Sequence, residues 1–277
     1  MQRSNLAAFF GFILFVGCNG GGGGPGARSS GGAQIVEREI IMVDPYIEGA
    51  TMCWDKNESG NCDDNEPESS VSSSKGVIRF SSAITGHPNG LPPGVKLVQK
   101  LKGVSLGKPF LGNLKTSSDL PIATPITTLI MNAGGDEDAK ELVLAKLNAS
   151  LGAAGIELSE EDILKNPMEG VEGKSNDLKL IVNTMAVNAA LIKNPNLALS
   201  NEPANLVSLP SDVLETAKVL KDVIKPEVIN ALLDPEKILK TAIVIQEFVA
   251  TRPINASFSS NDFDETKINT IVNTVSS

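Results

Sequence analysis

The sequence predicts an α+β protein in which a small N-terminal β-sandwich precedes an all-α helical domain. Short runs that alternate between apolar and polar residues, separated by Gly- and Pro-rich turns, occupy residues 34–120. No helical pattern separates these runs, which argues against a parallel sheet. Across residues 121–277 the apolar residues recur at the spacing of amphipathic helices.

Residues 1–17 are organised like a bacterial signal peptide. Arg3 is the positive residue at the start, and residues 6–16 form an apolar run that is too short to cross a bilayer as a helix. The run ends in Leu14-Phe15-Val16-Gly17-Cys18, which resembles the bacterial lipobox, whose cysteine becomes acylated. We therefore expect Cys18 to carry lipid. The alternative is an ordinary secretory signal that is cut nearby, with Cys18 incidental.

Residues 18–33 are mostly glycine and serine, which predicts a flexible tether. The chain has three cysteines, and a lipidated Cys18 leaves Cys53 and Cys62 as a pair. Disulfides persist in exported proteins, so we expect these two residues to be joined. The alternative is two buried free thiols.

The strands of the predicted sandwich fall in four runs: residues 34–42, 46–54, 76–81 and 94–101. Clusters of proline and glycine at residues 86–94 and 107–112 predict the turns.

The helical pattern begins near Thr124. Helices are expected over residues 136–151, 176–193, 211–224 and 235–250, with a last one after Asp262. In the first of these, Leu144, Leu147 and Leu151 share one stripe, which is typical of a core-facing helix.

Residues 55–66 have the spacing of a twelve-residue calcium loop. Gly60 is at position six, where the chain turns sharply. The candidate oxygen ligands are Asp55, Asn57, Ser59, the carbonyl of Asn61, Asp63 and Glu66. These donors suit Ca²⁺, a hard cation that takes six to eight oxygens. A solvated acidic loop that binds no metal is the alternative.

Several motifs in this region occur in the order found in a module of bacterial surface lipoproteins and adhesin-like proteins. Residues 43–50 (VDPYIEGA), the D-x-N-x-x-G loop from Asp55, and residues 124–129 (TPITTL) resemble its three signatures. Pro45 and Asn65 stand where that module has glycine. The resemblance implies a carboxypeptidase-regulatory-like or prealbumin-like sandwich on a surface-exposed protein.

The net charge of the chain and the kinds of side chain it contains argue against several functions. The formal net charge is −9 and no block of Lys or Arg occurs, so nucleic-acid binding is not expected. The one histidine, His87, lies in a turn-rich loop, which leaves a serine or cysteine triad without its usual base. Acidic residues 160–162 follow Ser159, where helix capping explains them. We predict no catalytic residues.

The sequence as a whole predicts a non-enzymatic lipoprotein of the bacterial cell envelope, stabilised by calcium, with a surface-binding or structural role. Its partners would be the membrane, through the N-terminal lipid, and a protein or glycan at the cell surface. Asn19 after the cysteine resembles an outer-membrane sorting signal, on either the periplasmic or the surface face. The alternatives are an enzyme acting on glycans or peptides in a cleft between sandwich and helices, and a small-ligand carrier with an apolar pocket among the helices.

Overall fold

The computed structural model describes residues 35–105, 107–151 and 157–169, together with residues 184, 187 and 188. The signal peptide, Cys18 and the tether lie outside the described residues, as do the helices expected over residues 211–224 and 235–250 and after Asp262. Of the helix expected over residues 176–193, only Thr184, Val187 and Asn188 are described, and all three are helical and buried.

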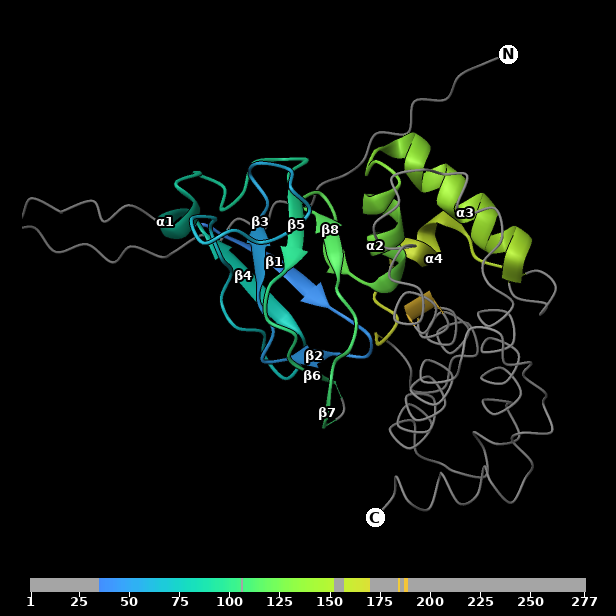
Figure 1. The fold of residues 1–277 in the computed structure, drawn as a ribbon, viewed down its shortest axis with the longest axis horizontal. Coiled ribbons are helices and arrows are strands. Elements are labelled where there is room, and N and C mark those ends of the chain that lie inside the picture. Colours follow the sequence, from blue (N-terminus) through green and yellow to red (C-terminus); the bar gives the residue numbers. More distant parts are fainter. Residues whose placement is uncertain (1–34, 106, 152–156, 170–183, 185–186, 189–277) are drawn as a thin grey trace, which may run out of the picture. The chain divides into compact units, whose positions relative to one another are not determined.

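The described strands form three small sheets (Figure 1). In the first, β1 (Glu37–Met42) pairs antiparallel with β4 (Val77–Ser81) and parallel with β9 (Ile122–Ala123). The second contains β2 (Ile47–Glu48), β6 (Val104–Ser105) and β7 (Lys108–Pro109), and the third contains β3 (Met52–Trp54), β5 (Lys96–Gln99) and β8 (Lys115–Ser117). Pairing within these two sheets is antiparallel.

Alternation along β1, the middle strand of the first sheet, directs every second side chain near its end into the core. Ile40 and Met42 are fully buried, whereas Glu39 points outward and pairs with Arg79 on β4 at 2.7 Å. All three sheets contribute to one apolar cluster, made of Ile40, Met42, Ile47, Ala50, Met52, Ile78, Phe80, Leu91, Leu97, Phe110, Leu114 and Ala123. This shared core fixes the position of β3 and β5, from which the candidate site is built.

The predicted strands at residues 34–42, 76–81 and 94–101 are confirmed as β1, β4 and β5. The run at residues 46–54 is instead two strands, β2 and β3, because Gly49 interrupts it with a left-handed backbone (φ +75°). Two corrections concern boundaries. The predicted turn at residues 107–112 contains strand β7, and β9 lies beyond residue 120, in the segment predicted to be helical. A short helix, α1 (Ser82–Thr85), was not predicted.

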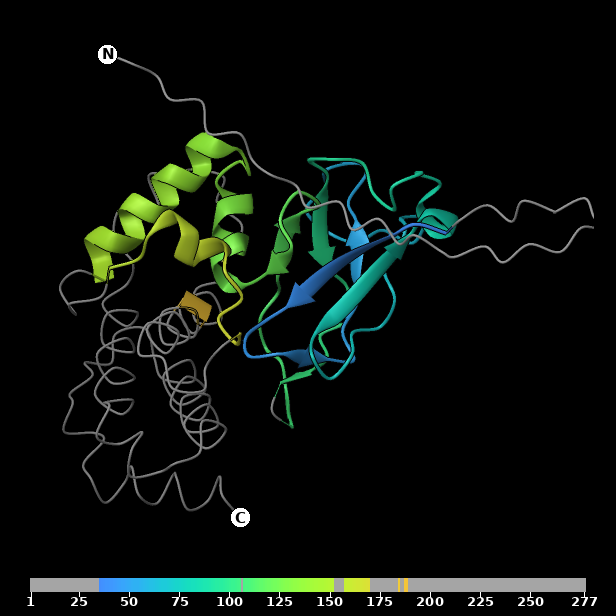
Figure 2. The same ribbon diagram turned by 180° about the vertical axis from the view of Figure 1, so that it is seen from behind.

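In the described part of the chain, three helices with defined bounds follow the strands, namely α2 (Pro125–Asn132), α3 (Glu137–Leu151) and α4 (Glu160–Leu164). Thr124 caps α2 through a reciprocal capping box with Thr127, and proline occupies the first turn. Helix α2 lies beside the third sheet, and Figure 2 shows this arrangement from behind. On α3 the buried face consists of Ala139, Val143 and Leu147, whereas Leu144 of the predicted stripe is only half-buried.

Candidate functional site

The loop of residues 55–66 leaves β3 and returns beside it. The backbone N–H of Trp54 donates to the carbonyl of Pro67 at 2.9 Å, which joins the two ends of the loop. The N–H of Asp55 donates to the carbonyl of Lys96 on β5 at 3.1 Å. The loop is therefore anchored on the third sheet at its first residue.

Asp55 organises the first half of the loop from a buried position. Its side chain is 3% exposed, and its two carboxylate oxygens accept hydrogen bonds from the N–H groups of Ser59 (2.9 Å) and Gly60 (2.8 Å). Gly60 has φ +79°, a left-handed conformation that favours glycine, which confirms the sharp turn predicted at position six. A carboxylate accepts about four hydrogen bonds or metal contacts, so Asp55 keeps lone pairs for a cation.

The other predicted ligands also hold the loop together. Asn57 Nδ2 donates to Asp63 Oδ2 at 2.6 Å, which brings positions three and nine side by side. Glu66 accepts from the N–H of Lys56 (2.7 Å) and from the N–H of Asp63 (3.1 Å).

Ser59 and Asn61 interact with each other beside that network. Ser59 Oγ donates to the carbonyl oxygen of Asn61 at 3.3 Å, the oxygen expected as the ligand at position seven. All six predicted ligands are thus placed by hydrogen bonds within one loop.

The six predicted ligands suit Ca²⁺, because each offers at least one neutral or anionic oxygen atom. Within the described part of the chain, no cluster of three or more His, Cys, Asp or Glu side chains has the arrangement of a metal site. In this conformation backbone N–H groups donate to the carboxylates of Asp55 and Glu66, and the side-chain amide of Asn57 donates to that of Asp63. Calcium binding therefore stays a prediction.

Positive side chains border the loop. Lys96 Nζ lies 3.0 Å from Glu58 Oε2, and the Lys56 ammonium lies 4.5 Å from the centre of the Trp54 ring. Lys115 of β8 faces Gly60, and burial lowers the pKa of its ammonium group below the ordinary 10.5, an effect that Asp55 partly opposes. Lysines on neighbouring strands thus offset part of the negative charge of the loop.

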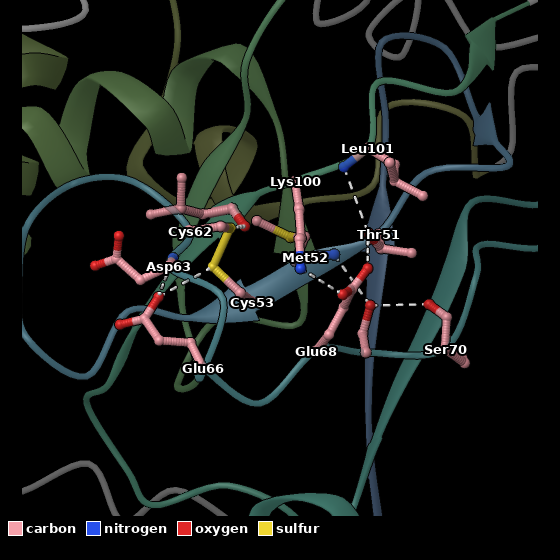
Figure 3. Close-up of polar contacts among 12 residues, drawn as sticks. Thr51, Met52, Cys53, Cys62, Asp63, Glu66, Glu68, Ser70, Lys100 and Leu101 are labelled. Atoms are coloured by element: carbon pink, nitrogen blue, oxygen red, sulfur yellow. Dashed lines mark hydrogen bonds and ion pairs between the residues drawn. A yellow bond between two sulfur atoms is a disulfide. The ribbon is translucent and has the colours of Figure 1, made fainter.

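Cys53 and Cys62 lie at disulfide distance, with their sulfur atoms 2.07 Å apart and their Cα atoms 5.8 Å apart (Figure 3). Cys53 is in β3 and is 1% exposed, whereas Cys62 is in the loop, with its sulfur 3.2 Å from the carbonyl oxygen of Val98. The bond therefore joins the middle of the loop to the strand that precedes it, as expected from the cysteine count.

Sequence reasoning missed the residues that other strands bring to this region. Thr51, Glu68 and Lys100 form a hydrogen-bonded group near the disulfide (Figure 3), and Lys115 and Asn132 lie beside the loop. The sequence carries no local signal for either group, because their members are separated by many residues and meet only through strand pairing and the packing of α2 on β8.

The other polar candidates have structural roles. His87 is half-buried in its turn, and its Nδ1 accepts a hydrogen bond from the N–H of Asn89 at 3.3 Å. Ser159 and Asp162 form a capping box at the start of α4, which confirms capping as the role of this acidic run. The helices that would line a carrier pocket lie largely outside the described residues.

Comparisons with protein-family models, curated proteins and solved structures find no match. Among the described residues, no helix has the length and apolar character needed to cross a membrane.

Proposed function

We propose that this chain is a non-enzymatic lipoprotein of the bacterial cell envelope, anchored through lipid on Cys18 and stabilised by calcium in the loop of residues 55–66. Its role would be surface binding or structural support. The anchor is supported by the apolar run and the lipobox-like residues that end in Cys18. An outer-membrane location, on the periplasmic or surface face, is supported by Asn19 as the next residue, which resembles an outer-membrane sorting signal.

The observation that carries the calcium part is the geometry of Asp55 and Gly60. In twelve-residue calcium loops an aspartate at position one and a glycine at position six shape the turn that presents the remaining ligands. Here the buried Asp55 carboxylate accepts the N–H of Gly60 at 2.8 Å, and Gly60 is left-handed. The link between Cys53 and Cys62 restricts the same loop, which reduces the ordering entropy that metal binding must overcome.

Lipidation is tested by growing bacteria that express the full chain with an alkyne-bearing fatty acid. We expect the wild-type protein to take up the label and to sediment with membranes, because acyl chains partition into the bilayer. Cys18→Ser should lose both properties. A Cys53→Ala/Cys62→Ala variant serves as the control and should keep them. Label on the Cys18→Ser protein, or unlabelled wild-type protein in the soluble fraction, would refute the anchor.

Calcium is tested by thermal unfolding of the full chain in detergent. If the loop binds with the affinity of extracellular calcium modules, about 5 mM calcium should raise Tm by roughly 4 °C, because a ligand that binds only the folded state stabilises it. Asp63→Asn should abolish the shift by removing a charged ligand. Asp64→Asn, at the adjacent exposed aspartate outside the ligand set, should keep it.

Two outcomes of this experiment would contradict calcium binding. One is an unchanged wild-type Tm in calcium, and the other is an equal shift in the Asp63 and Asp64 variants. Magnesium at the same concentration should give a smaller shift, because it demands a tighter octahedral arrangement of ligands than a flexible loop offers.

A further inference from the structure

A cavity of about 190 Å³ lies beside the loop, where four segments of the chain meet. Asp55 and Asn61 come from the loop, Lys96 from β5, Lys115 from β8, and Met131 and Asn132 from the end of α2. Pockets for drug-sized ligands measure roughly 300–1,000 Å³, so this cavity suits a molecule of about amino-acid size.

Asn132 is a buried polar residue in this lining whose hydrogen bonds are incomplete. The residue is 5% exposed, and its Nδ2 has no acceptor among the residues that the structure describes. Leaving a buried donor unsatisfied costs about 1–3 kcal/mol, so such groups are usually completed by a ligand, ion or water. Asn132 therefore points to a hydrogen-bonding occupant of the cavity.

Lys115 supplies a positive charge at the same place. Glu58 is engaged by Lys96 at 3.0 Å, and both oxygens of Asp55 accept backbone N–H groups of the loop. Within the described ranges, no hydrogen bond or ion pair is formed by the ammonium group of Lys115. Lys96 is thus paired with Glu58, whereas the Lys115 ammonium is attracted by the charge of Asp55 but makes no direct contact with an anionic group.

We infer that this cavity binds a small organic carboxylate, whose oxygens accept hydrogen bonds from the Lys115 ammonium and the Asn132 amide. An ammonium group forms charge-assisted hydrogen bonds with a carboxylate that are about twice as strong as neutral ones. Met131 and Leu97 line the cavity as well and offer apolar contact to the rest of the molecule. The inference does not depend on calcium binding, although Asp55 borders both sites.

The test compares propionate with propionamide, its neutral analogue of similar shape, by saturation-transfer NMR on the full chain in detergent. The buffer is freed of calcium with a chelating resin, because soluble chelators are themselves carboxylates. We expect millimolar binding of propionate and at least tenfold weaker binding of propionamide. Lys115→Met and Asn132→Leu should each weaken propionate binding by about tenfold or more, since each removes one donor to a charged acceptor.

Two control variants separate binding from folding. Lys75→Met removes a lysine that is exposed and outside the cavity lining, and it should bind propionate like the wild type. Lys115→Arg keeps the charge and should retain most of the affinity, which covers the case in which Lys115→Met does not fold. Equal binding of propionate and propionamide, or full affinity in folded Asn132→Leu, would overturn the inference. Neither result bears on whether calcium binds the loop.

Discussion

At the scale of single residues, two neighbouring side chains set the ionisation of Glu68, which lies near the disulfide. Thr51 Oγ1 donates to Glu68 Oε1 at 2.7 Å, and Lys100 Nζ lies 2.9 Å from Glu68 Oε2. The hydrogen bond from Thr51, followed by the interaction with Lys100, lowers the pKa of Glu68 below its ordinary value of 4.5. The charged form of Glu68 is therefore favoured in the folded protein.

Glu68→Gln should reduce stability in a pH-dependent way. Because the folded pKa is the lower one, the carboxylate stabilises the fold above the unfolded pKa, and this contribution is lost as the pH falls through the folded pKa. Near pH 7 the wild type should be more stable by up to about 1 kcal/mol, as expected for a partly exposed pair. Urea unfolding at neutral pH and near pH 3.5 measures the difference. Exposed Glu48→Gln is the control, and a difference that stays constant with pH would contradict the prediction.

At the scale of elements, the loop of residues 55–66 combines a local turn with a covalent link. Asp55 and Gly60 shape the turn, and the disulfide joins Cys62 to Cys53 across a sequence separation of 9 residues. A link of this kind stabilises chiefly by limiting the freedom of the unfolded chain.

Replacing both cysteines, as Cys53→Ala/Cys62→Ala, should lower the free energy of unfolding by roughly 2–3 kcal/mol, on the chain-entropy account of a short closed loop. Urea unfolding of the full chain measures the change. Cys18→Ser provides a matched cysteine control and should leave the stability unchanged. Reductant should destabilise the wild type but not the double variant; wild-type protein that is insensitive to reductant would show that the pair is not bonded.

At the scale of the whole molecule, hydrogen bonds connect the third sheet to α2. Thr128 Oγ1 accepts from the N–H of Lys115 at 2.9 Å, and Thr127 Oγ1 donates to the carbonyl of Lys115 at 2.8 Å. Both threonines are fully buried. Because α2 also ends at Asn132, this junction determines where the cavity lies relative to the loop.

Thr128→Val keeps the shape of the side chain but removes the acceptor, which leaves the N–H of Lys115 without its partner. We expect a loss of about 1–3 kcal/mol in the free energy of unfolding, the cost of a buried unsatisfied donor. Chemical denaturation is the measurement. Thr128→Ser retains the hydroxyl and should lose less, so a serine variant that is weaker than the valine variant would argue against the hydrogen bond as the cause.

Much of the local structure was predictable because its causes are local. The alternation of β1, the capping box of α4 and the turn at Gly60 depend on residues within a few positions of each other. The pairing of Cys53 with Cys62 followed from the count of cysteines, since lipidation of Cys18 would leave only that pair.

Two wrong predictions, for β9 and for the run at residues 46–54, concern features that do not have a local cause. Strand β9 was placed in the helical segment because two residues are too few to show a period, and it forms only because β1 offers an open parallel edge. The run that became β2 and β3 alternates as one strand would, but the left-handed backbone of Gly49 divides it. Pairing partners and backbone turns of this kind are decided by the surrounding structure rather than by the segment itself.

The sequence alone determined the elements with a clear period, the capping residues and the spacing of oxygen donors in the loop, because each of these is a short-range property of the chain. Only the tertiary structure decided which distant side chains meet. Lys115 and Asn132 reach the cavity beside Asp55 through the pairing of β5 with β8 and the packing of α2 on that sheet. Such contacts form because the strands and helices bury one shared apolar core. This driving force depends on the whole fold, so the contacts cannot be read from residues that are adjacent in sequence.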